Sequence, residues 1–239
     1  MSMKILAMDT SAKAASVAIT NGETPLAVYS LEAGRTHSET VLPMAESALK
    51  VAHLTLSDID LFAVTSGPGS FTGVRIGIST VKGLAFGTGK PCVGVSTLLA
   101  LAYNLKDLRD DCYVCPVMDA RRNQLYNALF SYHGGQFERL CDDRLVAMSD
   151  LKKELEALDK PVYGVGDGYD ILAAGFPGLS VTPILLRPQN AYSVALCALS
   201  EYEKAADRTV YTDTVLLPQY LRASQAEREL AEKEKGKSV

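Results

Sequence analysis

The stretch KILAMDTSAKAASVAITNGETPLAVYSL, residues 4–31, decides the fold because it holds three short apolar segments joined by tight turns. The segments KILAMD, ASVAIT and PLAVYSL have the length and the apolar content of strands. Asn21 and Gly22 lie between the last two and are a strong two-residue hairpin signal, since both turn positions need a positive φ. We therefore predict an antiparallel β-meander.

Alternating helices and strands follow the meander. Thr36 and Glu39 have the spacing of a capping box, ahead of a helix whose apolar residues recur at helical spacing. The strand DLFAVTSG comes next, then the glycine-rich loop GPGSFTG, a helix to about Gly87, the strand PCVGVST and a helix over residues 98–105. The predicted order of this half is βββαβαβα.

The second half repeats this order. YVCPVMD, LYNALFSY and FERL form another meander, with Gly134 and Gly135 at its hairpin. A helix over residues 149–158, the strand PVYGVG, a short helix, the strand SVTPILL and a helix over residues 190–206 follow. Asp9 ends the first strand of one half, and Asp119 ends the first strand of the other.

A repeat of this kind predicts an α/β fold of two homologous lobes with mixed sheets, facing each other across a cleft. One doubly wound sheet is the alternative. We place the first lobe at residues 1–106, the second at 107–214, and a return segment with a charged helix or tail at 215–239. Such lobes resemble the ribonuclease-H-like superfamily of actin, the sugar kinases and the Hsp70 ATPase, whose cleft holds ATP between the two meander turns.

The turns that would hold ATP lack glycine. Backbone N–H groups bind phosphate best where small residues let the chain approach closely. The first turn, DTSAKAAS, offers Asp9, Thr10 and Ser11, which are candidates to hold a phosphate or the waters of a cation. The second, DARRNQ, places long side chains where the phosphates need room, although its arginines could instead be phosphate ligands. We expect at most a vestigial nucleotide cleft, with weak binding there or at a subunit interface.

Composition excludes several classes of protein. The chain has 239 residues, 47% of them hydrophobic, which is enough for a sizeable core. Its net charge of −4 and the lack of a Lys/Arg stripe favour contact with tRNA only through a complex. Its apolar runs are too short to span a membrane, and its start does not resemble a signal peptide, so we expect a cytoplasmic protein without membrane contact. The scattered cysteines suit buried thiols better than disulfides.

Several segments together resemble the bacterial TsaB (YeaZ) family of tRNA threonylcarbamoyladenosine biosynthesis proteins. They are ILAMDTSAKAASVAI, HSETVLPMAESAL, SGPGSFTGVRIGISTVKGLAFG, GVSTLLALA and LPQYLRASQAER. The resemblance implies a non-catalytic subunit that forms a heterodimer with the transferase TsaD and acts with the ATPase TsaE. It also implies that the chain forms a homodimer through the same surface when TsaD is absent.

TsaD carries a metal-binding H-x-x-x-H motif, and the resemblance places its two histidines at Thr97 and Leu101 of this chain. Leucine cannot bind a metal, and a threonine hydroxyl is a weak ligand. We therefore predict no metal, no catalytic residue and no resident cofactor. His37, His53 and His133 fit solvent-facing or helix-capping positions, because their spacing brings no metal site together.

The helix after the glycine-rich loop carries small residues on one face. Interior glycines cost about 1 kcal/mol each relative to alanine, so Gly77 and Gly83 need a compensating contact. The preceding helix also has apolar area beyond a single stripe. Packing inside the chain alone would account for both faces, but the resemblance favours a partner there. The predicted interface residues are Val41, Met44, Ala45, Ala48, Gly73, Ile76, Gly77, Thr80 and Gly83.

The loop GPGSFTG is not a phosphate loop of the Walker type. Val74 and Arg75 follow Gly73, where Lys and Ser or Thr would be needed. We interpret Gly67 and Gly69 as a tight turn from strand to helix. Two other functions remain as alternatives: an autonomous nucleotide-dependent enzyme of the actin-like superfamily, and a glycoprotease-like metallohydrolase.

Overall fold

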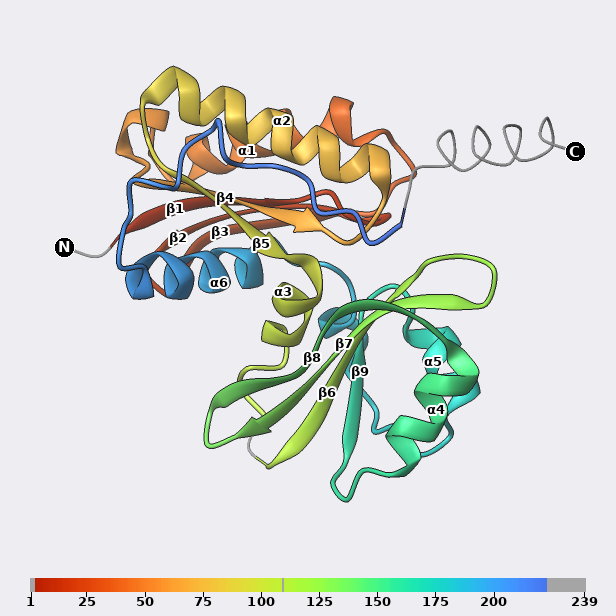
Figure 1. The fold of residues 1–239 in the computed structure, drawn as a ribbon. Helices are drawn as coiled ribbons and strands as arrows, with labels where there is room; N and C mark the ends of the chain where they lie inside the picture. Colours follow the sequence, from red (N-terminus) through yellow and green to blue (C-terminus); the bar gives the residue numbers. More distant parts are fainter. Residues whose placement is uncertain (1–2, 109, 223–239) are drawn as a thin grey trace, which may run out of the picture.

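The computed structural model describes residues 3–108 and 110–222, and the charged tail predicted after residue 222 lies outside them. It has two lobes, each built on its own mixed sheet (Figure 1). The first sheet has the strand order β3-β2-β1-β4-β5, and the second has the order β8-β7-β6-β9. The strands of the first sheet are β1 (Lys4–Asp9), β2 (Ala15–Asn21), β3 (Thr24–Leu31), β4 (Leu61–Gly67) and β5 (Cys92–Ser96). Those of the second are β6 (Cys112–Asp119), β7 (Gln124–His133), β8 (Gln136–Ala147) and β9 (Val162–Val165).

Both predicted meanders are present. In the first, β2 pairs antiparallel with β1 and with β3. Asn21 pairs with Thr24, so the turn residues are Gly22 and Glu23 rather than Asn21 and Gly22. Gly22 alone among these has a positive φ, of 59°. The hairpin prediction is therefore correct in place and shifted by one residue in detail.

Helices cover both faces of the first sheet. Alternate residues of a strand point to opposite faces, and Leu6 and Met8 of β1 pack under α1 (His37–Val51) and α2 (Phe71–Thr88). Ile5 and Ala7 pack on the other face against α6 (Ala191–Lys204). Thr36 is the N-cap of α1, but its side chain makes no capping hydrogen bond, so the predicted capping box does not form.

The second sheet is covered by α3 (Thr97–Tyr103) on one face and by α4 (Met148–Glu156) and α5 (Tyr169–Gly175) on the other. Cys112 packs with the α3 side and Cys115 with the α4 side. The two thiols of this C-x-x-C pattern therefore lie on opposite faces of β6. Both are free thiols, as expected.

The strand predicted at SVTPILL is wrong. Only Ser180 forms a bridge to Tyr163 of β9, and the chain then turns into a short 3-10 helix at Ile184–Leu186. Pro183 explains the break, because proline has no N–H to donate to a β-ladder. The second sheet consequently has one strand fewer than the first.

Helix α6 was predicted in the second lobe, but it packs on the first sheet (Figure 1). The return segment after it also lies on the first lobe. Cys92 N donates to Tyr211 O at 3.1 Å, Gln219 N donates to Ser66 O at 2.7 Å, and Leu216 enters the first-lobe core. The first lobe is therefore built from both ends of the chain. None of the helices in the described parts of the chain has the length and apolar character needed to cross a membrane.

The glycine-rich loop packs against the chain itself. Gly67 and Gly69 have positive φ values and form the predicted turn between β4 and α2. A Cβ on Gly73 would overlap the Thr10 carbonyl oxygen, and one on Gly77 would overlap the Thr10 hydroxyl. The prediction that Gly73 and Gly77 leave room for a partner helix is therefore wrong, since they leave room for the end of β1.

Gly83 differs from these two glycines, because a Cβ added there meets no atom within 4 Å. Gly73→Ala should lower the free energy of unfolding by roughly 2 to 3 kcal/mol, the usual cost of an overpacked core. Gly83→Ala, its matched control on the same helix, should raise it by about 0.5 to 1 kcal/mol. Urea denaturation measures both. Equal effects of the two substitutions would show that α2 does not approach β1 as described.

Candidate functional site

A cleft of about 360 Å³ lies between the lobes, where β1 and β6 end. Residues from both meander turns line it, as predicted for this fold. The lining residues are Ser11, Ala12, Lys13, Gly69, Ser70, Met118, Asp119, Ala120, Arg121, Tyr126 and Asp167. The cleft is therefore the candidate ligand site of the chain.

Asp9 is buried beside the cleft rather than lining it. Its Oδ1 accepts hydrogen bonds from the backbone N–H and the hydroxyl of Ser11, at 2.8 and 2.7 Å. Burial raises the pKa of the Asp9 carboxyl to about 6, although the hydrogen bonds from Ser11 lower it. The side chain has an internal structural partner and is poorly placed to reach a ligand in the cleft.

Thr10 also serves the fold. Its hydroxyl donates to the Gly73 carbonyl oxygen at 2.7 Å and is fully buried. Of the three predicted cofactor ligands, only Ser11 lines the cleft, and its hydroxyl is committed to Asp9. The role of Asp9, Thr10 and Ser11 toward a nucleotide therefore stays a prediction. The hydrogen bond of Thr10 joins the end of β1 to α2, and those between Asp9 and Ser11 lie within the turn.

The second turn holds three consecutive residues with positive φ: Arg121, Arg122 and Asn123, at 65°, 56° and 59°. Left-handed conformation in non-glycine residues costs of the order of 1 kcal/mol each. Asp119 stabilises the turn by accepting a hydrogen bond from Arg121 N at 2.7 Å. Only Arg121 lines the cleft, so the expectation that Arg122, too, fills it is wrong.

Asp167 is a cleft residue that the sequence reasoning missed. Although much of the residue is exposed at the cleft edge, partial removal of water from its carboxyl raises the pKa, and the nearby Asp119 adds to this. Gln189 donates to it at 3.4 Å. Asp167 follows the predicted strand PVYGVG directly, and β9 runs parallel to β6, so the shared carboxyl edge of the two strands was the signal.

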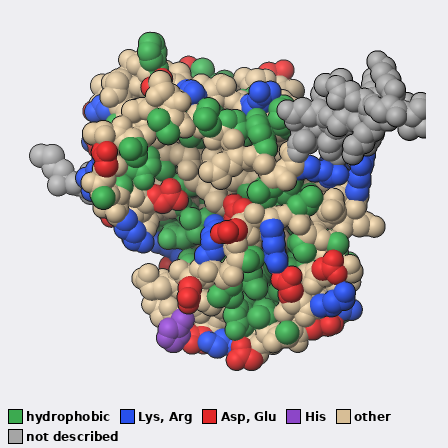
Figure 2. Space-filling view, viewed as in Figure 1, with side chains coloured by type: hydrophobic (Ala, Val, Ile, Leu, Met, Phe, Trp, Pro, Cys, Tyr) green, Lys and Arg blue, Asp and Glu red, His purple; other side chains and the backbone are tan. Residues whose placement is uncertain are grey.

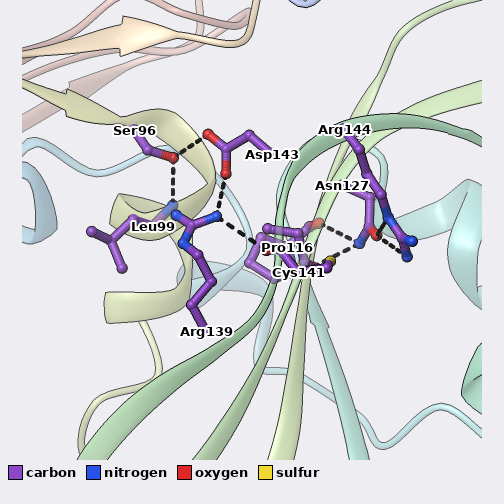
Figure 3. A network of polar contacts seen from close by, with 9 residues as sticks. Ser96, Leu99, Pro116, Asn127, Arg139, Cys141, Asp143 and Arg144 are labelled. Carbon is purple, nitrogen blue, oxygen red and sulfur yellow. Dashed lines mark hydrogen bonds and ion pairs between the residues drawn. The ribbon is translucent and has the colours of Figure 1, made fainter.

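Polar contacts between the lobes fix the cleft (Figure 3). Ser96, at the end of β5, accepts a hydrogen bond from Leu99 N and so caps α3, and it donates to Asp143 of β8 at 2.5 Å. The other oxygen of Asp143 accepts from Arg139 at 2.6 Å. On the opposite side, Arg222 donates to Ala120 O at 3.0 Å. These contacts tie the second lobe to the first, and Asn104, which follows α3, adds hydrogen bonds to Leu186 O and Pro188 O.

A second network shown in Figure 3 stiffens the second sheet. The guanidinium of Arg144 donates twice to the Asn127 side-chain oxygen, at 3.2 and 3.1 Å, and also pairs with Glu154. Asn127 in turn donates to Pro116 O at 3.1 Å. These contacts join β6, β7, β8 and α4, so the lobe can hold its cleft turn in a strained conformation.

The predicted interface residues divide into two groups. Those in the lobe core are Val41, Ala45, Ala48, Gly73 and Gly77. Those at least partly at the surface are Met44, Ile76, Thr80 and Gly83. The first group faces the sheet, because both helices pack on it with the side that carries small and apolar residues. Only the second group can touch a partner without unpacking the lobe.

The histidines and the positions aligned with the TsaD metal motif give no metal site. Thr97 and Leu101 are buried on α3, where Leu101 packs in the second-lobe core. His37 is half-buried, and its Nε2 donates to Ala12 O at 2.7 Å, while Thr36 is the N-cap of α1, so His37 is neither the solvent-facing nor the helix-capping residue predicted. His53 and His133 are exposed, in line with expectation. In residues 3–108 and 110–222, no group of three or more potential ligand side chains is placed to hold a metal.

Comparison with known proteins identifies relatives. Residues 27–230 match the family model of TsaD, the tRNA N6-adenosine threonylcarbamoyltransferase. The chain is 33% identical to the tRNA threonylcarbamoyladenosine biosynthesis protein TsaB of Bacillus subtilis strain 168, over 98% of this chain and 100% of that one. It is 38% identical to TsaB of Escherichia coli strain K12, over 60% and 64% of the two chains. The structure of YeaZ from Pseudomonas aeruginosa superposes with a TM-score of 0.73 and 26% identity, covering 92% and 100%.

The raised pKa of Asp9 makes stability depend on pH. Because the folded-state pKa, about 6, exceeds the unfolded value of 3.8, the folded state binds more protons between pH 4 and 6. Stability should therefore fall by up to about 3 kcal/mol as pH rises through this window. Asp9→Asn should remove this part of the dependence, measured by urea denaturation at a series of pH values.

Ser11→Ala provides the control, because it removes a hydrogen bond that favours the Asp9 carboxylate. It should raise the folded-state pKa of Asp9 further, so the loss of stability should extend to higher pH and become larger. Parallel stability curves for the wild type and both variants would contradict the burial of an ionisable Asp9.

Proposed function

The chain belongs to the TsaB (YeaZ) family of tRNA threonylcarbamoyladenosine biosynthesis proteins, and on this basis we propose that it is a non-catalytic subunit that supports TsaD. In this proposal it forms a heterodimer with TsaD and works with the ATPase TsaE in the modification of tRNA. Without TsaD it pairs with a second copy of itself. The observation that carries the proposal is the outer face of α1 and α2.

This outer face, defined by Met44, Ile76, Thr80 and Gly83, presents small and apolar groups to the surface. Gly83 is open to solvent in mid-helix, where it costs about 1 kcal/mol relative to alanine. Val51 lies seven residues after Met44, on the same side of α1, and is 64% exposed. A partner helix lying against this face would bury these groups and use the space over Gly83.

The chemistry of the cleft supports a subunit without its own reaction. Asp119 and Asp167 line the cleft together with Lys13 and Arg121, so the charges of the lining balance and give a polyphosphate no net attraction. The hydroxyls of Thr10 and Ser11 are already engaged in the fold. The proposed chain therefore needs no resident cofactor or metal, and its contribution is to hold TsaD in the competent arrangement.

Reconstitution tests the whole proposal. The purified chain alone should not transfer threonylcarbamoyl groups to tRNA, whereas TsaD and TsaE should require it for full activity. Modified adenosine in a tRNA transcript is measured by nucleoside analysis. Transfer by the isolated chain would show that it is an enzyme, and undiminished activity of TsaD and TsaE without it would show that it is not their subunit.

Two substitutions on the outer face test the interface. Gly83→Arg and Ile76→Glu should each weaken the heterodimer at least about tenfold, because each places a charge in a desolvated contact, while the thermal midpoint changes little. Ala174→Arg, on exposed α5 of the second lobe, is the control and should leave the affinity unchanged. Analytical ultracentrifugation or calorimetry gives the affinities. Wild-type affinity in both outer-face variants would place the partner elsewhere.

A further inference from the structure

Three cationic side chains without ion pairs lie on loops that border the cleft or the groove beside it. Lys13, Arg35 and Arg122 are exposed, and within the described residues none of them has a carboxylate within ion-pair distance. We call these three residues the cationic rim. They stand out because the chain as a whole has a net charge of −4. Figure 2 shows Lys and Arg side chains, with Asp and Glu side chains between them, along the gap between the two lobes.

The rim follows two adjoining hollows. Lys13 lines the cleft and also a groove of about 470 Å³ on the first lobe. Arg35 lines the same groove, while Arg122 follows Arg121 in the turn on the other lobe. Ile76 of the outer face also lines the groove. The rim therefore extends from the second lobe, past the cleft, to the edge of the face assigned to TsaD.

The field at the rim favours anions outside the cleft. The N-terminal turns of α1 and α2 reach the groove through His37 and Thr72, and helix N-termini carry a partial positive charge. Glu32 is the acidic residue in the lining of the groove, beside Lys13 and Arg35, whereas inside the cleft Asp119 and Asp167 balance Lys13 and Arg121. The groove, with two cations, one carboxylate and two helix N-termini, would thus attract a phosphate group more strongly than the cleft.

The strained turn after β6 adds to this arrangement. Its three left-handed residues hold the side chains of Arg121 and Arg122 at the surface, and Arg222 ties the turn to the return segment through Ala120 O. Arg121 shares its charge with Asp119 at 3.5 Å, whereas Arg122 has no such partner. The turn therefore presents a free guanidinium group, which suits the geometry of a phosphate.

We propose that the cationic rim binds successive backbone phosphates of the tRNA that the complex modifies. This inference rests on the proposed function, which brings tRNA to the chain. Cations on separate loops, spread along the mouth, suit the repeating charges of a phosphodiester backbone better than one small anion. The contact is to phosphates and carries no sequence specificity. Because the chain is acidic overall, we expect TsaD to provide most of the tRNA affinity and the rim to add to it.

A variant in which glutamine replaces all three cations of the rim tests this inference. Lys13→Gln/Arg35→Gln/Arg122→Gln is compared with Lys152→Gln/Lys153→Gln/Lys204→Gln, which makes the same charge change on α4 and α6. Fluorescence anisotropy with a labelled, unmodified tRNA transcript is measured over a salt series, for the free chain and for its heterodimer with TsaD. Circular dichroism and thermal unfolding verify that both variants fold.

The rim variant should lose about tenfold or more in tRNA affinity, and the slope of log affinity against log salt should fall by about two to three. The control variant should keep the wild-type slope. Equal slopes in both variants, or no binding by the free wild-type chain at low salt, would overturn the inference. So would displacement of the tRNA by ATP or pyrophosphate at matched ionic strength, which would make the rim a nucleotide site.

An acidic protein partner is distinguished in the same experiment. If the rim variant loses affinity for TsaD while its tRNA slope stays unchanged, the rim serves a protein contact and the inference is wrong. Failure of the proposed function gives a different result, namely no heterodimer with the wild-type chain. The titration of the free chain with tRNA measures the contribution of the rim to tRNA affinity whether or not the heterodimer forms.

Discussion

The close approach of the β1 turn to helix α2 is the constraint on which the rest of the structure depends. Thr10 donates to the Gly73 carbonyl, and the missing side chains at Gly73 and Gly77 let α2 lie directly on the end of β1. On either side of this contact, Asp9 is buried, which raises its pKa, and Ser11 lines the cleft. It also turns the opposite side of α2 outward, so the lobe core and the proposed partner face are two sides of one helix.

Electrostatics then separates what the cleft can hold from what its mouth can hold. The cleft lining combines Lys13 and Arg121 with Asp119 and Asp167, whereas Arg35 and Arg122, which have no ion pair among the described residues, lie outside it. The tie through Ser96, Asp143 and Arg139 joins β5, the N-terminus of α3 and β8, so the two lobes keep these groups in fixed relation (Figure 3). These features are consistent with a chain that supports the reaction of another protein. Its lobes are held together by side-chain contacts, whereas its cleft offers few free groups to a ligand.

Much of the fold could be predicted from the sequence, because alternation in strands and the helical period of α1, α2 and α6 are local signals. The strand predicted over residues 180–186 was wrong. The prediction gave more weight to their apolar character than to Pro183, which has no N–H to donate to a β-ladder. The placement of α6 was wrong because the choice of sheet depends on contacts distant in sequence. Asp9 and Asp119 located the site in the sequence. The hydrogen bond between Ser96 and Asp143 could not be predicted, because no sequence motif marks it. The glycines showed that a close approach exists without showing which segment makes it.

The path of the chain through the lobes has a consequence for folding. The second lobe is contiguous, whereas the first sheet receives α6 on one face and Leu216 in its core only from the far end of the chain. During synthesis, the second lobe can complete its own core while one face of the older lobe is still bare. The first lobe to be made is therefore the last to be finished, and chaperones would meet its uncovered sheet until the final residues emerge.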